Sequence, residues 1–305
     1  MLEQQMFTGC GTAMVTPFRR DGAVDEATLV RLIHRQIEAG IDFLVPCGTT
    51  GESPTLSREE HLRVVELTVD VAKGKVPVLA GAGGYNTAEV IGLAGELAAI
   101  GVEGILSVTP YYNKPTQEGL YQHYRAIASA TSLPIILYSV AGRTGVNIEP
   151  PTVKRLAEVD NIIGIKEASG SISQMATILN TVPRDFIVLS GDDAIALPLI
   201  ALGGRGVISV VSNEIPEEMA YLTMLCLKGD FVGAREMQRR YQTLMEVNFV
   251  ESNPIPVKTA MAEMGLLEPV WRLPLVAPKT ENHERIRSVL ASLGLVERVH
   301  AAIAN

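Results

Sequence analysis

Hydrophobic and polar positions follow a repeating two-part pattern along most of this chain. A short apolar run comes first, and a longer stretch with apolar residues at helical spacing follows it. A short run bounded by turn residues is typical of a strand buried on both faces, and helical spacing is typical of an amphipathic helix. The predicted strands are 8–14, 42–47, 76–81, 103–108, 134–139, 162–166, 186–190 and 206–210. The predicted helices are 25–39, 57–73, 87–100, 117–130, 150–158, 171–181, 193–202 and 215–228.

Polar residues that can cap a helix stand before several of these helical stretches. Ser57 is followed by Glu60 at the spacing of a capping box, in which each side chain bonds the other residue's backbone. Glycine, the usual residue after a helix end, follows the stretches that finish near 39, 100 and 202. The predicted N-caps are Asp25, Ser57, Thr87 and Ser171.

Eight strand–helix units predict a (β/α)8 TIM barrel, because regular alternation implies parallel strands with helices outside them. A doubly wound open sheet is the structural alternative, but it has fewer strands. After residue 230 no strand is predicted, and the helical stretches are 231–247, 253–265, 281–293 and 295–303. We therefore expect a catalytic barrel at 1–230 and a small helical domain at 231–305, within the overall α/β class.

Composition narrows the possible partners and locations. The formal charge of −8 argues against nucleic acid or an anionic membrane as the main partner. Cys10, Cys47 and Cys226 are too few and too far apart for a disulfide framework or a zinc site, so no metal is predicted. The amino terminus lacks the basic and apolar regions of a signal peptide, and no apolar run is long enough to span a bilayer. We expect a cytoplasmic protein.

Lys166 is the first candidate for chemistry, because it ends a predicted buried strand just before a Ser/Gly turn. Desolvation disfavours the ammonium, so we expect a lowered pKa and some neutral amine that can attack a carbonyl to form a Schiff base. The alternative is a structural lysine whose ammonium reaches the solvent at the strand end.

Other polar residues stand at the carboxyl ends of the predicted strands, where the active site of a barrel forms. Thr49 and Thr50 lie in a Gly-Thr-Thr-Gly turn, which could bind a carboxylate or could be only a tight structural turn. Tyr138 could be catalytic or part of the core, and Arg143 could bind a carboxylate or be a solvated charge. Together with Lys166, this set indicates amine catalysis on a small carboxylated carbonyl compound. The five histidines lie in or beside helices and are expected to be structural or superficial.

Six motifs resemble, in order and spacing, those of the dihydrodipicolinate synthase family. The resemblance covers essentially the whole chain. The motifs are residues 48–53 (GTTGES), 110–115 (PYYNKP), 138 with 142–147 (Y, GRTGVN), 164–170 (GIKEASG), 190–193 (SGDD) and 251–258 (ESNPIPVK).

The resemblance implies a role for each of these residues. Lys166 would form the Schiff base with pyruvate, and no separate cofactor would be needed. The hydroxyls of Tyr138, Thr49 and Tyr112 would relay protons. Tyr112 would reach into the site from a neighbouring subunit of a dimer of dimers. Other residues would bind substrates or line the pocket: Thr49 and Thr50 for the pyruvate carboxylate, Arg143 for the carboxylate of aspartate semialdehyde, and Gly191 and Ile208 near the lysine. The implied reaction is the aldol-type condensation that gives 4-hydroxy-tetrahydrodipicolinate in lysine and diaminopimelate biosynthesis.

The chain departs from the common family pattern in three places, one of which is Thr259, where tryptophan is frequent after Pro-Val-Lys. Residues 139–141 read Ser-Val-Ala, where these synthases commonly have Asn-Val-Pro. Lysine-inhibited members generally carry histidine and asparagine at the positions of Arg58 and Tyr85, whereas His61 and Glu89 are retained. Because a guanidinium repels an ammonium, we expect weak or absent inhibition by lysine.

Two other functions remain open on sequence alone. One is a related pyruvate-dependent lyase, of the N-acetylneuraminate lyase or 2-keto-3-deoxygluconate aldolase type, which shares the lysine and tyrosine but typically lacks the arginine. The other is a catalytically silent barrel that acts as a binding protein. Arg143 and residues 166–170 favour the synthase over the lyase. The silent barrel is disfavoured by the intact set of Lys166, Tyr138, Thr49, Tyr112 and Arg143.

Overall fold

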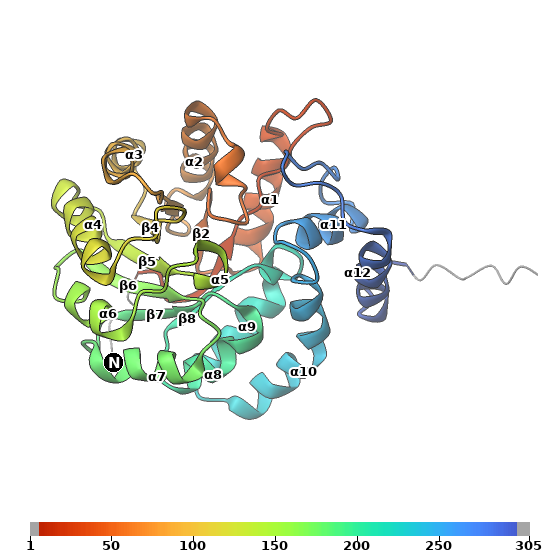
Figure 1. Cartoon of the computed structure of the whole chain (residues 1–305). Helices are drawn as coiled ribbons and strands as arrows, with labels where there is room; N and C mark the ends of the chain where they lie inside the picture. Colours follow the sequence, from red (N-terminus) through yellow and green to blue (C-terminus); the bar gives the residue numbers. More distant parts are fainter. Residues whose placement is uncertain (1–5, 298–305) are drawn as a thin grey trace, which may run out of the picture.

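The computed structural model describes residues 6–297 and contains the predicted barrel of eight parallel strands surrounded by helices (Figure 1). Each strand pairs with its neighbour in the order β2-β1-β8-β7-β6-β5-β4-β3. A parallel bridge between Leu44 and Val78 joins β2 to β3 and closes the ring. The strands are β1 Gly9–Ala13, β2 Phe43–Val45, β3 Leu79–Gly81, β4 Gly104–Val108, β5 Ile135–Ser139, β6 Ile162–Glu167, β7 Ile187–Ser190 and β8 Gly206–Ser209.

Helices follow the strands and pack around the outside of the barrel. The main ones agree with the predicted stretches within two residues, except where noted below. They are α1 Glu26–Glu38, α2 Arg58–Ala72, α3 Thr87–Ile100, α4 Gln117–Ala130, α6 Pro150–Leu156, α7 Ile172–Thr181, α8 Ala196–Ala201 and α9 Pro216–Leu227.

The strands separate two hydrophobic clusters, because successive side chains of a strand point to opposite faces. On β5, Ile136 and Tyr138 belong to the cluster inside the barrel, whereas Ile135 and Leu137 belong to the cluster beneath the helices. Both faces of the strand are therefore apolar, which explains the continuous apolar runs in the sequence.

Beyond α9, the described part of the chain forms three further helices, which pack against one side of the barrel (Figure 1). They are α10 Phe231–Val247, α11 Ile255–Glu263 and α12 Thr280–Ser292. Contacts run from α10 to α9 and from α11 to the 3-10 turn Val211–Asn213. The predicted boundary at residue 230 falls between α9 and α10, but the division into two domains stays a prediction.

Four details of the predicted secondary structure were wrong. Asn86, not Thr87, caps α3, because its side chain accepts a hydrogen bond from the Ala88 backbone N–H. The helix predicted at 193–202 is split into a 3-10 turn, Asp193–Ile195, and α8. A four-residue helix, α5 Ala141–Thr144, was not predicted. Residues 295–297 are not helical, and the rest of the stretch predicted at 295–303 lies outside the described residues.

The other three predicted caps were confirmed. Asp25 accepts from Thr28 N, Ser171 accepts from Gln174 N, and Ser57 forms the full capping box with Glu60. These side chains satisfy backbone donors that have no partner within the helix.

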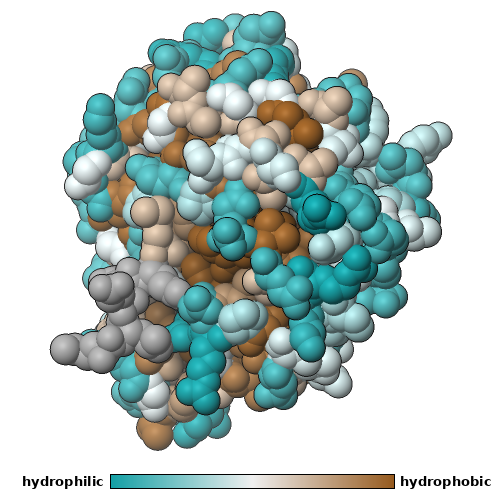
Figure 2. Space-filling view, turned by 90° about the vertical axis from the view of Figure 1, so that its left-hand side faces the viewer, coloured by the Kyte–Doolittle hydropathy of each residue, from teal (hydrophilic) through white to brown (hydrophobic). Residues whose placement is uncertain are grey.

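The polarity of the outer surface reflects the amphipathic helices that form it. Figure 2 shows mostly hydrophilic residues on one face, with hydrophobic residues gathered near the middle. Within residues 6–297, no helix has the length and hydrophobicity needed to cross a membrane.

Candidate active site

Lys166 and Tyr138 lie side by side at the carboxyl ends of β6 and β5. They are register partners in the parallel ladder, so both side chains point into the barrel. Lys166 is only 5% exposed, and its Nζ lies 4.4 Å from the centroid of the Tyr138 ring. Lys166 and Tyr138 therefore lie at the same end of the barrel, as the sequence predicts.

Because Gly191 has no side chain, there is room beside it for the Lys166 side chain. A Cβ atom at position 191 would lie 3.2 Å from Lys166 Cε and 2.6 Å from the Ala168 Cβ. Any larger residue there would press on the lysine. Ile208 of β8 is fully buried in the same interior cluster as Tyr138, so it forms part of the floor.

A cavity of about 710 Å³ opens at this end of the barrel. Such a volume is in the usual range for small-molecule sites and exceeds what a three-carbon acid needs. Four of the predicted site residues line it: Thr49, Tyr112, Tyr138 and Arg143. Lys166 is not among the lining residues, but its Nζ lies over the ring of Tyr138, which is one of them. The predicted residues Thr50, Gly191 and Ile208 are not among the residues that line it.

Arg143 is carried by α5, the short helix that follows β5. Its backbone N–H donates to the Val140 carbonyl, so the chain turns sharply and the guanidinium faces the mouth of the cavity. Its Nη2 donates to the backbone carbonyl of Asn253 at 3.0 Å. One N–H of the guanidinium is thereby fixed, and the others remain available for an anion.

The unusual Ser-Val-Ala loop is well supported where it starts. The Ser139 hydroxyl donates to Asn147 Oδ1 at 3.1 Å and accepts from the Ile148 backbone N–H at 3.0 Å. Thr144, at the end of α5, accepts from Thr109 Oγ1 at 3.1 Å. The Ser139 bonds tie the start of the loop to the segment before α6, and the Thr144 bond ties its end to Thr109, which follows β4. The changed residues at 139–141 therefore still present Arg143 at the rim.

Contacts from the C-terminal segment complete the site, and sequence reasoning did not assign them. Asn253, which is 5% exposed, donates from Nδ2 to Thr50 Oγ1 at 2.9 Å. Lys258 donates to Glu52 Oε1 at 2.6 Å, and both side chains are fully buried. Burial lowers the pKa of Lys258, and the neighbouring Glu52 opposes that shift. Residues 251–258 were noted as a motif, but nothing in the motif indicates its contacts.

Tyr112 differs from the rest because its side chain projects into solvent. It is 92% exposed and has a backbone φ of 63°, a left-handed conformation that is unfavourable for a bulky residue. The next residue holds the loop, since Asn113 Nδ2 donates to the Tyr85 carbonyl at 3.1 Å. Tyr111 packs edge-on against Tyr85, with ring centroids 5.2 Å apart.

His61 lines the cavity, although sequence reasoning placed all histidines away from it. It lies on the buried face of α2, and its Nε2 is 3.0 Å from the Gly81 carbonyl. Burial lowers the pKa of His61 to about 4, so the ring is neutral near pH 7. Its spacing within α2 could have indicated its burial but not the cavity.

The two aspartates after β7, Asp192 and Asp193, make structural hydrogen bonds to backbone groups. Asp192 caps the following turn by accepting from Ala194 N at 2.9 Å, as expected. Asp193 is buried and accepts from the backbone N–H groups of Val210 and Val211. Across residues 6–297, no group of three or more His, Cys, Asp or Glu side chains is arranged to hold a metal ion.

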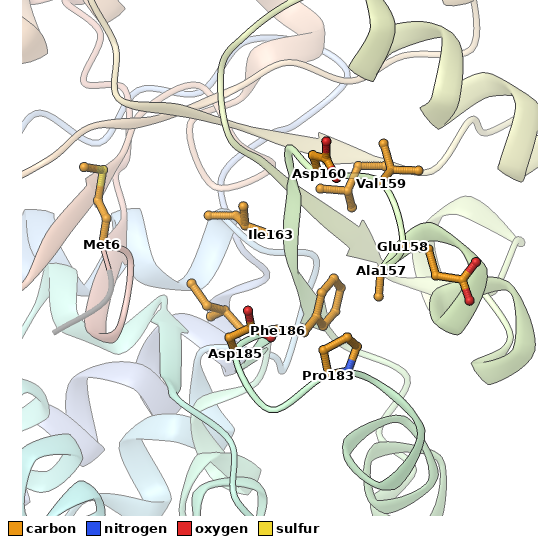
Figure 3. Close-up of a pocket in the computed structure, with 11 residues that line it drawn as sticks. Met6, Ala157, Glu158, Val159, Asp160, Ile163, Pro183, Asp185 and Phe186 are labelled. Atoms are coloured by element: carbon orange, nitrogen blue, oxygen red, sulfur yellow. The ribbon is translucent and has the colours of Figure 1, made fainter. Parts of the chain in front are cut away.

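A second cavity, of about 470 Å³, lies at the opposite end of the barrel, where β6 and β7 begin (Figure 3). Its lining residues include three acidic side chains, Glu158, Asp160 and Asp185, and no basic one. An acidic lining disfavours carboxylated substrates. The carboxyl end of the barrel is therefore the candidate active site.

Comparisons with known proteins agree with this geometry. The sequence model of the dihydrodipicolinate synthetase family matches residues 6–293. The chain belongs to the dihydrodipicolinate synthetase family. It is 51% identical to a 4-hydroxy-tetrahydrodipicolinate synthase of Koribacter versatilis over 96% of this chain and 98% of that protein.

Solved structures of the dihydrodipicolinate synthetase family share the fold. The Thermotoga maritima dihydrodipicolinate synthase superposes with a TM-score of 0.94 at 44% identity, covering 96% of this chain and all of that one. A further structure, described as a monomeric dihydrodipicolinate synthase variant, has a TM-score of 0.93 at 44% identity and covers 95% and 98% of the two chains. The predicted family and (β/α)8 barrel are both confirmed.

Proposed function

We propose that this chain condenses pyruvate with L-aspartate 4-semialdehyde to give 4-hydroxy-tetrahydrodipicolinate, a step of lysine and diaminopimelate biosynthesis. The activity follows the names of its relatives, which are synthases rather than sugar-acid lyases. The observation that carries it is the buried Lys166 beside Tyr138 at the carboxyl end of the barrel.

Lys166 acts as the nucleophile in the proposed mechanism. Its neutral amine attacks the C2 carbonyl of pyruvate, and the carbinolamine loses water to give an iminium. The iminium withdraws electrons, so a C3 proton leaves and an enamine forms. The enamine C3 then bonds to the aldehyde carbon of the semialdehyde, and the aldehyde oxygen takes up a proton. Attack of the semialdehyde's amino group on the iminium closes the ring and releases the lysine.

Hydroxyl groups carry the protons for these steps. Tyr138 and Thr49 line the same cavity, and Tyr112 would extend the relay from a neighbouring subunit. A hydroxyl can both donate and accept, so a chain of hydroxyls moves protons without a histidine. Among the histidines within residues 6–297, only neutral His61 lines the cavity, and it lies on the α2 side.

The two substrate carboxylates bind to different groups. Thr49 and Thr50 hold the carboxylate of pyruvate, and Arg143 holds that of the semialdehyde. Gly191 and Ile208 shape the space around Lys166. No metal or separate cofactor takes part, because the covalent bond to Lys166 supplies the electron sink.

A substrate panel tests the proposed activity. Purified protein receives pyruvate with aspartate semialdehyde and, separately, N-acetylneuraminate or 2-keto-3-deoxygluconate. We expect the semialdehyde to be consumed only when pyruvate is present and neither sugar acid to be cleaved. Cleavage of a sugar acid without consumption of the semialdehyde would instead show that the protein is a retro-aldolase. No reaction with any of these substrates would favour a catalytically silent binding protein.

Replacing Tyr112 with phenylalanine is expected to lower kcat about 100-fold, because the proton relay loses its outer hydroxyl. The matched control is Tyr221→Phe, at another exposed tyrosine, on α9, outside the residues that line the cavity. Initial rates with both substrates measure the effect. Near-normal turnover of the Tyr112 variant would remove this residue from the relay.

The same variant tests whether Tyr112 acts in a neighbour's site, as the proposed dimer of dimers requires. The exposed side chain supports that arrangement, although one family structure is described as monomeric. Mixing Tyr112→Phe with an inactive Lys166→Ala variant under subunit exchange would combine an intact lysine and an intact tyrosine in one site. Recovery of activity on mixing supports a shared site, and a mixture as inactive as its parts contradicts it.

Lysine is expected to inhibit weakly or not at all. Arg58 is held by Glu96 at 2.8 Å and places a guanidinium on α2, near enough to His61 to act on it electrostatically. An ammonium-bearing effector would be repelled there. Initial rates across micromolar lysine measure this, with the double variant Arg58→His, Tyr85→Asn as the comparison. Strong inhibition of the unmodified protein in that range would overturn the expectation.

A further inference from the structure

Asn253 lies outside the eight strand–helix units, in the segment between α10 and α11, yet it touches two substrate-binding groups of the barrel. Its Nδ2 donates to Thr50 Oγ1 at 2.9 Å, and its backbone carbonyl accepts from Arg143 Nη2 at 3.0 Å. Thr50 follows β2, and Arg143 lies in α5, which follows β5. One C-terminal residue thus links both of the groups assigned above to substrate carboxylates.

The bond to Thr50 sets the direction of that hydroxyl. A threonine hydroxyl has one proton to donate and lone pairs to accept with. Because it accepts from Asn253, its proton is free to point elsewhere. An ionised carboxylate can only accept, so Thr50 is left in the state that pyruvate requires.

The bond to Arg143 orients a guanidinium that is otherwise exposed. A backbone carbonyl carries no net charge, so it holds one N–H without neutralising the cation. The remaining donors can still meet a carboxylate in a bidentate pair. Since this bond uses the backbone, it does not depend on the side chain at position 253.

Only one of the two polar atoms of the Asn253 side-chain amide makes a hydrogen bond to another described residue. Within residues 6–297, its buried Oδ1 has no hydrogen-bond partner. A buried acceptor without a donor is unfavourable, so an amide is a poor choice for packing alone at this position. The N–H donor is the part of the side chain that the site uses.

We propose that Asn253 is a positioning residue: its amide keeps the Thr50 hydroxyl as a donor to the pyruvate carboxylate, and its carbonyl orients Arg143 for the second substrate. This inference rests on the proposed function, because it takes Thr50 and Arg143 as the carboxylate-binding groups.

The test follows the formation of the lysine adduct with pyruvate alone, trapped by borohydride and counted by mass spectrometry. We expect Asn253→Ala to raise the half-saturating pyruvate concentration about tenfold, as the loss of an oriented hydrogen bond to a charged group would. The KM for the semialdehyde should change less than about twofold, because the carbonyl to Arg143 remains. The neighbouring Ser252→Ala, at an exposed side chain, is the matched control and should behave as the unmodified protein.

Two further variants separate positioning from a structural role. Asn253→Asp has the same shape but can only accept, so Thr50 must donate to it, and pyruvate should bind more weakly than in Asn253→Ala. In a Thr50→Ala background, Asn253→Ala should add nothing, since the hydroxyl it orients is gone. Because Asn253→Asp keeps the packing, its result decides the matter even where alanine impairs folding.

Three results would overturn the inference while the unmodified protein still forms the adduct. They are an unchanged pyruvate dependence in Asn253→Ala, a normal Asn253→Asp, or additive effects in the double variant. Failure of the unmodified protein to form any adduct would instead contradict the proposed function.

Discussion

Replacing Lys166 with alanine is expected to abolish adduct formation with pyruvate and to lower kcat at least about 1,000-fold, as removal of a catalytic nucleophile does. The amine is buried beside Tyr138 at the carboxyl end of β6, where a small keto acid in the cavity would meet it. Lys166→Arg should be equally inactive, because a guanidinium stays protonated and cannot attack a carbonyl. Borohydride trapping with intact-mass analysis measures the adduct, and coupled initial rates measure turnover.

The control for this prediction is a lysine outside the site. Lys228, exposed at the end of α9, should be replaceable by alanine with no loss of either signal. Folding is compared by circular dichroism, so that a loss of adduct is not confused with a loss of structure. A pyruvate adduct that forms on the Lys166→Ala variant at the normal rate would show that another amine is the nucleophile.

The second large effect is expected at the buried pair of Glu52 and Lys258. Lys258 donates to Glu52 at 2.6 Å and to the Thr16 carbonyl at 3.1 Å, and both charged side chains are 0% exposed. Lys258→Met removes the cation and leaves the carboxylate buried without its partner. Such a loss typically costs about 3–5 kcal/mol of unfolding free energy, because the remaining charge keeps its desolvation penalty. Urea unfolding followed by circular dichroism measures it.

A double variant and an exposed pair make the test specific. Glu52→Gln combined with Lys258→Met removes both charges and should regain much of the stability. Arg239→Met breaks the exposed pair with Glu236, whose side chains are 74% and 70% exposed, and should cost less than about 1 kcal/mol. Equal stability of Lys258→Met and the unmodified protein would show that Glu52 finds compensation elsewhere.

Glu52 also connects this stability to catalysis. It follows Thr49 and Thr50 in the same turn, with a left-handed φ of 53°, and its Oε2 accepts from the Arg272 backbone N–H at 3.3 Å. The C-terminal segment therefore anchors the loop that carries the hydroxyls proposed to bind pyruvate. We expect Lys258→Met to weaken pyruvate binding as well as folding.

Sequence patterns predicted the barrel almost completely. The eight strands appear as short apolar runs because both of their faces are buried, and the helices appear as amphipathic stretches because one face is solvated. One error falls where two residues of the same capping type stand next to each other. Asn86 and Thr87 can both cap α3, and hydrophobic spacing does not choose between adjacent capping residues.

Part of the candidate site was also predictable, for a topological reason. In a parallel barrel all strands end at the same rim, so residues that follow different strands are brought together. This places Lys166 and Tyr138 side by side, and Thr49 and Arg143 along one cavity. The role of His61 as a lining residue was missed, because its helical spacing indicates burial but not what lies beyond.

The sequence by itself determined the fold class, the family and the rim residues, since each depends on local periodicity or on the order of motifs along the chain. Only the tertiary structure decided which partners hold those residues in place. Asn253 meets Thr50, and Lys258 meets Glu52, across more than 200 residues of sequence. No local pattern encodes such contacts, because they depend on how the C-terminal segment packs against the finished barrel. Lys166 could be singled out in the sequence, whereas the C-terminal partners of Thr50 and Glu52 became evident only in three dimensions.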